Sequence, residues 1–386
     1  ISNGLYTVFG NGRTTAQKSV KIVTKKVTKN GKKVTKRVKK TVTKKVRKNV
    51  IAMYDNSGVL RSEMPLEANV AKNMQIIYDN IVYPCSANKF TRINDLGQVT
   101  RIYQVNGYKQ DGEFAYDGYG NIYFIASALG KKTSRNSRIM SLELETGKVS
   151  LALDFDNFLS EMYKKSGKKA NWIDINSVQV CGTNKLIISS KSLSSIFKVS
   201  NVGSLLPKLD YIIADKDIWA KCKNLKKKVL KKYSKDDADE SATADPSATD
   251  DTDSIESILN QGKKKPDPFR SQYGQNALTS NSSGTLITML NNNAGKYAKK
   301  SNDKSYYYQF KVNESAKNYR VSEKKAFEKT SNNGNIIKGD SRYIYCCSDK
   351  GKFIETDSAG KLIKGFKTGG RPYRVYKNDW KNFWFY

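Results

Sequence analysis

The most informative feature of this 386-residue chain is that it contains no histidine. Histidine is the one side chain whose ordinary pKa lies near neutral pH, and it is the most frequent general acid or base in enzymes. Its absence excludes Ser-His-Asp and Cys-His catalysis and every metal site that needs an imidazole ligand. Chemistry at neutral pH must therefore rest on other groups.

Other signals are missing as well. The five cysteines form no C-x-x-C pair, so we expect neither a zinc site nor a redox motif, and we expect buried small apolar residues instead. No run of 18 apolar residues occurs, so no transmembrane segment is predicted. We expect no metal and no cofactor. Because the chain starts at Ile1 rather than Met, we expect a preceding segment such as a signal peptide.

Positive charge is abundant. The chain has 69 Lys and Arg against 36 Asp and Glu, a formal net charge of +33. Such a balance favours polyanionic partners: nucleic acid, anionic cell-wall polymer, sulfated glycan or an acidic membrane. The 23 Tyr and 14 Phe favour a β-rich protein.

Polar turns with glycine recur along the chain, each followed by an alternating strand. The spacing of these turns is roughly 40 to 55 residues, which is typical of β-propeller blades, and we count six repeats. The sequence thus predicts an all-β, six-bladed β-propeller as one domain over residues 1–386; a generic β-sandwich array is the alternative. The turns are Asp55-Asn56-Ser57-Gly58, Asn94-Asp95-Leu96-Gly97, Glu145-Thr146-Gly147 and Asp357-Ser358-Ala359-Gly360.

A basic insert spans residues 18–48, with fifteen Lys or Arg and no acid. Asn30-Gly31 is a strong hairpin signal, and a turn there places Val27 opposite Val34 and Val23 opposite Val38. We predict a protruding two-stranded hairpin with valines on one face and cations on both edges; a helix is the weaker alternative. Its candidate polyanion-binding residues are Lys25, Lys26, Lys29, Lys32, Lys33, Lys36, Arg37, Lys39, Lys40, Lys44, Lys45, Arg47 and Lys48.

A second insert spans residues 223–267. It opens with lysines and continues with an Asp-rich tract of Ala, Ser and Thr. Such a composition cannot bury enough apolar surface to fold alone, so we predict a disordered, low-complexity charged insert.

Several strings resemble the arylsulfate sulfotransferase family. They are Asn171-Trp172-Ile173-Asp174-Ile175-Asn176-Ser177, the run Lys185 to Lys198, Tyr273-Gly274-Gln275-Asn276-Ala277 and Tyr373-Arg374-Val375-Tyr376. The resemblance runs from about Leu5 to Tyr386, interrupted by the two inserts. It implies a six-bladed propeller whose central funnel holds the site, and transfer of a sulfuryl group from an aryl sulfate to a phenol through a histidine that takes the group.

This chain departs from the family pattern at its chemical positions. Asn276 stands where the resemblance implies the nucleophilic histidine, and an amide nitrogen is not a nucleophile. Asp174 stands at a second histidine, and Lys191 stands at a sulfate-binding arginine. Asp111-Gly112 replaces a histidine pair, whereas Asn176 matches the family. We expect little family catalysis to survive these replacements.

Two functions follow as hypotheses. The preferred one is a pseudoenzyme: an extracellular or cell-surface propeller that binds an anionic polymer or the cell envelope, or acts as a scaffold. The alternative is an active aryl-sulfate sulfotransferase with a substituted nucleophile such as Asp174, for which aryl sulfates and phenols would be partners. Specific nucleic-acid binding is not expected, because aromatic residues are scarce in the basic hairpin. A solvated, non-specific charge run is the remaining alternative for that segment.

Overall fold

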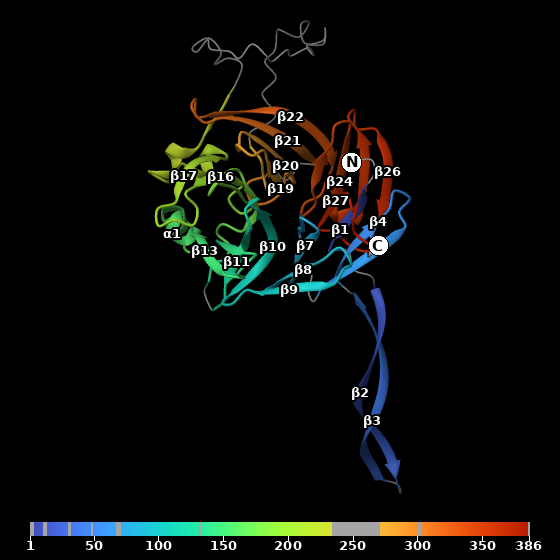
Figure 1. Ribbon diagram of the computed structural model, residues 1–386. Helices are drawn as coiled ribbons and strands as arrows, with labels where there is room; N and C mark the ends of the chain where they lie inside the picture. Colours follow the sequence, from blue (N-terminus) through green and yellow to red (C-terminus); the bar gives the residue numbers. More distant parts are fainter. Residues whose placement is uncertain are drawn as a thin grey trace. The chain divides into compact units, whose positions relative to one another are not determined.

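Six small sheets of four or five strands build this protein, and they form a six-bladed β-propeller (Figure 1). The computed structural model confirms the fold class that the turn spacing predicts. It describes residues 4–10, 14–29, 32–47, 49–66, 71–130, 133–233, 271–298 and 303–384. The chain divides into two compact units, Ile1–Glu113 with Asn333–Tyr386, and Phe114–Asn332. The single domain expected over residues 1–386 stays a prediction.

The first unit holds three blades and the basic hairpin. Its first blade has the strand order β27-β1-β4-β5, so it is built from both ends of the chain. The other two blades follow sequence order, as β6-β7-β8-β9 and β23-β24-β25-β26. The bounds are β1 (Leu5–Phe9), β2 (Thr14–Lys29), β3 (Lys32–Arg47), β4 (Asn49–Tyr54), β5 (Leu60–Leu66), β6 (Gln75–Ile77), β7 (Asn80–Ser86), β8 (Lys89–Ile93), β9 (Val99–Gln104), β23 (Ile336–Lys338), β24 (Arg342–Cys347), η3 (Ser348–Lys350), β25 (Lys352–Asp357), β26 (Leu362–Lys367) and β27 (Arg374–Asn378).

The second unit also holds three blades, with short helices between them. The strand orders are β10-β11-β12-β13, β14-β15-β16-β17 and β18-β22-β21-β20-β19. The bounds are β10 (Tyr108–Tyr116), in which the unit begins, β11 (Asn121–Ala128), β12 (Arg138–Glu143), β13 (Val149–Asp154), α1 (Phe155–Phe158), α2 (Ser160–Lys165), β14 (Ile175–Val180), β15 (Leu186–Ser190), β16 (Ser195–Ser200), β17 (Lys208–Ile213), α3 (Lys216–Trp219), η1 (Leu225–Lys228), β18 (Lys231–Lys232), β19 (Asn276–Ser280), β20 (Leu286–Asn291), β21 (Lys304–Asn313) and β22 (Asn318–Glu328).

The predicted polar turns lie between the third and fourth strands of their blades. In the first of them the Asp55 carboxylate accepts from the backbone N–H of Ser57 at 2.8 Å and of Val59 at 3.0 Å. Gly58 has a φ of 86°, which glycine adopts without strain. The Asn94 side chain makes the same kind of bonds in its turn. Three of the four turns are therefore closed by their own leading Asp or Asn, which is why the pattern is visible in sequence.

Aromatic packing fixes the helices of the second unit to its blades. The Phe197 ring on β16 lies 5.9 Å from Phe155 of α1 and 5.8 Å from Trp219 of α3. All three side chains are fully buried. Both helices are thereby held against the β14–β17 blade, and α3 contributes Asp217 and Ile218 to the wall of the pocket described below. Four of the five cysteines are also buried and all five are free thiols, as expected for small apolar residues.

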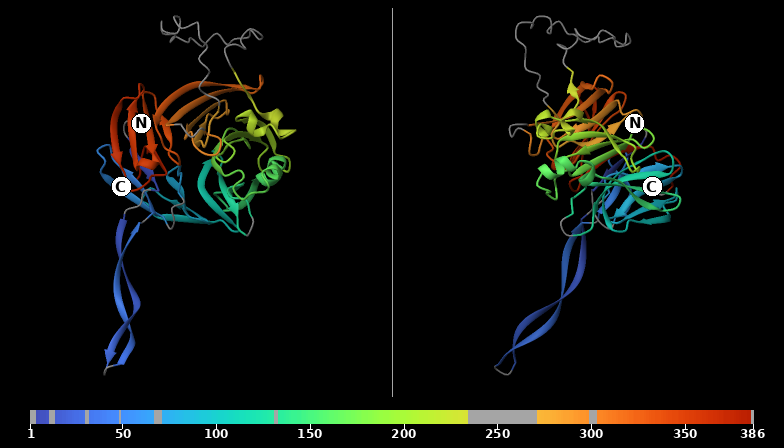
Figure 2. Two further views of the ribbon diagram at one scale, coloured as in Figure 1. Left: turned by 180° about the vertical axis from the view of Figure 1, so that it is seen from behind. Right: turned by 90° about the vertical axis from the view of Figure 1, so that its left-hand side faces the viewer.

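The basic hairpin is confirmed as a two-stranded ribbon, β2–β3, which pairs with no other strand among the described residues (Figure 1, Figure 2). Val23 pairs with Val38 and Val27 with Val34, as predicted from the Asn30-Gly31 turn. That turn itself lies outside the described residues. The predicted valine face also carries cations, because Lys25 and Lys36 pair directly opposite each other on it. The sequence repeats every four residues while side chains alternate every two, so lysine pairs and valine pairs share one face.

The expected disorder of residues 223–267 was wrong for the first part of that segment. η1 begins at Leu225, and the two residues of β18 pair in parallel with Asn318 and Tyr319 of β22. Leu230 is buried and supplies the apolar anchor that holds this stretch on the blade. The low-complexity remainder, residues 234–270, lies outside the described residues.

Across the described ranges, no helix is long and apolar enough to cross a membrane.

Candidate functional site

Four of the six family-aligned positions lie in the second unit, where they form two hydrogen-bonded pairs. Asn176 stands near the start of β14 and Asn276 at the start of β19; both are buried. The Asn176 amide nitrogen donates to the backbone carbonyl of Gln275 at 2.7 Å and to the Asn276 side-chain oxygen at 3.3 Å. The position aligned with the family nucleophile is therefore held as a hydrogen-bonded amide.

Gln275 anchors this position to the neighbouring blade. Its side-chain nitrogen donates to the Ser189 hydroxyl at 3.1 Å and to the backbone carbonyls of Ser190 at 3.1 Å and Ser195 at 3.0 Å. The residue before it, Gly274, has a φ of 61°. Hydrogen bonds thus connect the run Lys185 to Lys198 with the string Tyr273 to Ala277. The sequence showed both strings, but not that Gln275 links them.

Asp174 is placed by the loop that leads into β14. Its backbone φ is 44°, and its carboxylate accepts from the Asn136 amide at 3.0 Å and lies 3.7 Å from the Arg135 guanidinium. Its backbone carbonyl accepts from the N–H of Lys191 at 3.1 Å, so the two aligned positions are neighbours. The Lys191 ammonium donates to the Asn332 side chain. Both contacts are made by one carboxylate oxygen, Oδ1, and the side chain is 21% exposed.

Asp111 and Gly112 belong to the first unit, where they join a buried charge cluster. The Asp111 carboxylate accepts from the Lys72 ammonium, and the Gly112 carbonyl accepts from the Lys72 backbone N–H at 3.2 Å. Burial opposes the charged form of Lys72, but the Asp111 carboxylate prevails and raises the pKa of this lysine above its usual value. Asp111 is therefore neutralised by a lysine that sequence reasoning did not single out.

A second ion pair completes this cluster. Glu113 and Arg374 lie 2.6 Å apart and are almost fully buried. Burial raises the pKa of the Glu113 carboxyl, although the Arg374 charge opposes that shift. The Arg374 guanidinium also donates to the Tyr376 hydroxyl at 3.1 Å. The charges of the cluster are thus paired internally.

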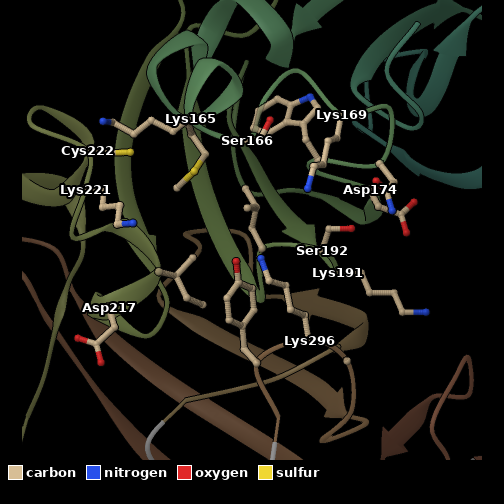
Figure 3. A pocket seen from close by; sticks show the side chains of 17 residues that line it. Lys165, Ser166, Lys169, Asp174, Lys191, Ser192, Asp217, Lys221, Cys222 and Lys296 are labelled. Atoms are coloured by element: carbon tan, nitrogen blue, oxygen red, sulfur yellow. The ribbon is translucent and has the colours of Figure 1, made fainter. Parts of the chain in front are cut away.

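A pocket of about 620 Å³ opens in the second unit beside the aligned residues Asp174 and Lys191 (Figure 3). Buried Trp172 and Met162 contribute apolar surface, and the Trp172 ring nitrogen is held by Asp156 at 2.8 Å. Five ammonium groups border this space against two carboxylates, those of Asp174 and Asp217. The lysines are Lys165, Lys169, Lys191, Lys221 and Lys296. Four of them were missed, because they come from the end of α2 and from three loops with no shared motif.

The candidate polyanion-binding residues occupy the ribbon as predicted by position. Eight of them have described side chains, and all are exposed: Lys25, Lys26, Lys32, Lys33, Lys36, Arg37, Lys39 and Lys40. The side chains of the others lie outside the described residues: Lys29, Lys44, Lys45, Arg47 and Lys48. Within the described part of the chain, no group of three or more Cys, Asp or Glu side chains could hold a metal ion.

The sequence and the fold can be compared with known proteins. The sequence model of the family described as Arylsulfotransferase (ASST) matches residues 10–366. No curated protein matches the chain in sequence.

Among solved structures, a protein of unknown function from Bacteroides caccae is similar at 10% identity and a TM-score of 0.47, over 97% of this chain and 98% of that one. Virginiamycin B lyase from Staphylococcus aureus is similar at 13% identity and a TM-score of 0.41, over 88% and 85%. The periplasmic gluconolactonase of Pseudomonas aeruginosa is similar at 8% identity and a TM-score of 0.42, over 86% and 80%.

Proposed function

This chain belongs to the arylsulfotransferase family, and we propose that it is a non-catalytic member that binds an anionic polymer through its β2–β3 ribbon. The partner class is a sulfated glycan or an anionic polymer of the cell envelope. The protein would act outside the cell or at the cell surface, either by binding this polymer or as a scaffold.

The observation that carries the proposal is the arrangement of cations on the ribbon. Lys21 pairs with Lys40 and Lys25 with Lys36, and each such pair forms one lysine rung of the ribbon. The two Cβ atoms of a rung lie about 5 Å apart, so their ammonium groups are close neighbours. Successive rungs on this face are four residues apart, or roughly 13 Å. Like charges this close repel, and an anionic polymer lying along the ribbon would relieve the repulsion.

No carboxylate competes for these lysines within the described residues. None of the ion pairs found there involves a ribbon cation, and the described ribbon side chains are exposed. The charges are thus accessible to an external polyanion. Val27 and Val34 between the lysine rungs are 43% and 48% exposed, which adds apolar contact surface to the same face.

The aligned site supports the non-catalytic half of the proposal. Sulfuryl transfer by the family route needs a nitrogen nucleophile, and the amide nitrogen of Asn276 has its lone pair conjugated to the carbonyl. Asp174 is engaged by Asn136 and Arg135. Asp111 is paired with Lys72. Each replaced histidine position thus carries a group that is either not nucleophilic or already occupied by a partner.

The test is the salt dependence of binding to heparin and to teichoic acid. Affinity should fall by about a thousandfold between 50 and 200 mM salt if six or more anionic groups are contacted. A variant with Lys21, Lys25, Lys36 and Lys40 each changed to Thr keeps strand propensity and should lower the slope of log affinity against log salt by roughly three.

A matched control changes four exposed lysines elsewhere to Thr: Lys148, Lys311, Lys361 and Lys367. It carries the same net charge as the ribbon variant and should bind nearly as the parent does. Replacement of residues 14–47 by a short linker gives a second variant without the ribbon. Unchanged affinity in both ribbon variants, or equal loss in the control, would refute polymer binding by the ribbon.

A further inference from the structure

The pocket beside Asp174 has a charge distribution that the ribbon does not explain. Its walls come from α2 and the loop after it, the loop after β15, α3 and the turn that follows it, and the loop after β20, all within the second unit. The ribbon belongs to the first unit. The two cationic features are therefore independent sites on the chain.

Three of the five lysines direct their ammonium groups into the pocket. Figure 3 shows Lys169 and Lys296 extending toward its centre from opposite sides and Lys221 from a third side. None of these three has a carboxylate within ion-pairing distance among the described residues. The Lys296 ammonium lies over the Tyr297 ring, with its nitrogen 5.1 Å from the ring centroid.

The acids of the pocket are placed at its margins. Asp174 lies at one edge and is already bonded to Asn136. Asp217 lies at another edge, with its carboxylate directed away from the centre in Figure 3. Among the described residues, the centre of the pocket is therefore positive, and no carboxylate there offsets the repulsion between the three cations.

We propose that this pocket binds a small organic molecule that carries two or more phosphate or sulfate groups. Three converging ammonium groups need more than one negative charge for neutralisation, whereas an aryl sulfate ester supplies a single one. A volume of about 620 Å³ holds a molecule of the size of a bis-phosphorylated sugar. Ser166 and Ser192 supply hydroxyl groups on the wall for neutral parts of such a ligand.

The test measures binding to the full chain by isothermal titration calorimetry at low salt. The probes are fructose 1,6-bisphosphate, N,6-O-disulfated glucosamine and, as the singly charged comparison, 4-nitrophenyl sulfate. We expect the two doubly charged probes to bind at least tenfold more tightly than 4-nitrophenyl sulfate. The ratio between them tells whether phosphate or sulfate is the preferred group.

Variants assign the binding to the pocket. Lys169→Gln and Lys296→Gln should each weaken binding of the preferred probe about tenfold, since each removes one charged contact. Lys148→Gln, an exposed lysine of the same unit outside the pocket, should leave binding unchanged. Equal affinity for all three probes, or wild-type affinity in both pocket variants, would overturn the proposal.

The ribbon variant separates this proposal from the function proposed above. Threonine at Lys21, Lys25, Lys36 and Lys40 should leave binding of the small probes intact. Loss of their binding in that variant would place the small anions on the ribbon and contradict the pocket assignment, without affecting the case for polymer binding.

Discussion

At the scale of single residues, hydrogen bonds connect side chains of the aligned site to one another and to the neighbouring blade. Asn176 donates to Asn276, and Gln275 is bonded to three groups of the neighbouring blade. The sequence identified Asn276 and Asn176 because they stand in recognisable strings. It could not identify Lys72 as the partner of Asp111, because the pair is brought together only by the fold.

Replacement of Gly274, the residue before Gln275, should lower the stability of the protein. A Cβ at this position would lie 2.5 Å from the backbone carbonyl oxygen of Ala294, and its φ of 61° disfavours any other residue. Gly274→Ala should lower the free energy of unfolding by about 3 kcal/mol in a urea titration. Gly118→Ala is the matched control, because Gly118 has a φ of 83° but open space around it, and it should cost about 1 kcal/mol. Equal losses would show that the close approach to Ala294 is unimportant.

Glu355 should make the stability of the first unit depend on acid pH. Burial raises the pKa of this carboxyl, but hydrogen bonds from Arg342 and Tyr6 outweigh burial, and the pKa lies below its usual value. A lowered pKa in the folded state stabilises the protein above the unfolded-state pKa of about 4.3, and this contribution is lost as the pH falls below it. Urea titrations between pH 6 and 3 should show this loss in the parent.

In Glu355→Gln the decline with falling pH should be shallower, since no carboxylate remains to be protonated. Asp340→Asn removes an exposed carboxylate of the same unit and should keep the parent's decline. A parent-like decline in Glu355→Gln would contradict this assignment.

At the scale of elements, turns and ribbon register were predictable and insert boundaries were not. Three of the four turns close on their own leading Asp or Asn, so the blade repeat depends on local contacts that the sequence reveals. The ribbon register followed from a single turn signal. The folded start of the second insert was missed, because β18 depends on pairing with Asn318 and Tyr319 far along the chain.

Repulsion between the opposed lysines should lower the stability of the β2–β3 ribbon. Lys25→Glu places a carboxylate opposite Lys36 and should slow hydrogen exchange of the ribbon amides about two- to fivefold at low salt. Lys36→Glu should act in the same way. The double variant restores like charges and should exchange as fast as the parent, so slower exchange in the double variant would contradict the repulsion argument.

At the scale of the whole molecule, the chain combines a family fold with altered chemistry and two cationic features. The fold class was predictable because each blade repeats one local pattern. The lysine pocket was not, because its walls come from helices and loops of several chain segments that no single motif connects. The family match over residues 10–366 fixes the architecture and leaves the partner to be established by experiment.

The most direct measurement is the rate of 4-nitrophenol release from 4-nitrophenyl sulfate with phenol as acceptor, catalysed by the full chain at neutral pH. The account predicts a rate no faster than that of buffer, because Asn276 offers no nucleophile and Asp174 is held by Asn136 and Arg135. Saturable turnover that disappears in Asp174→Ala would contradict it and establish an active sulfotransferase with a substituted nucleophile.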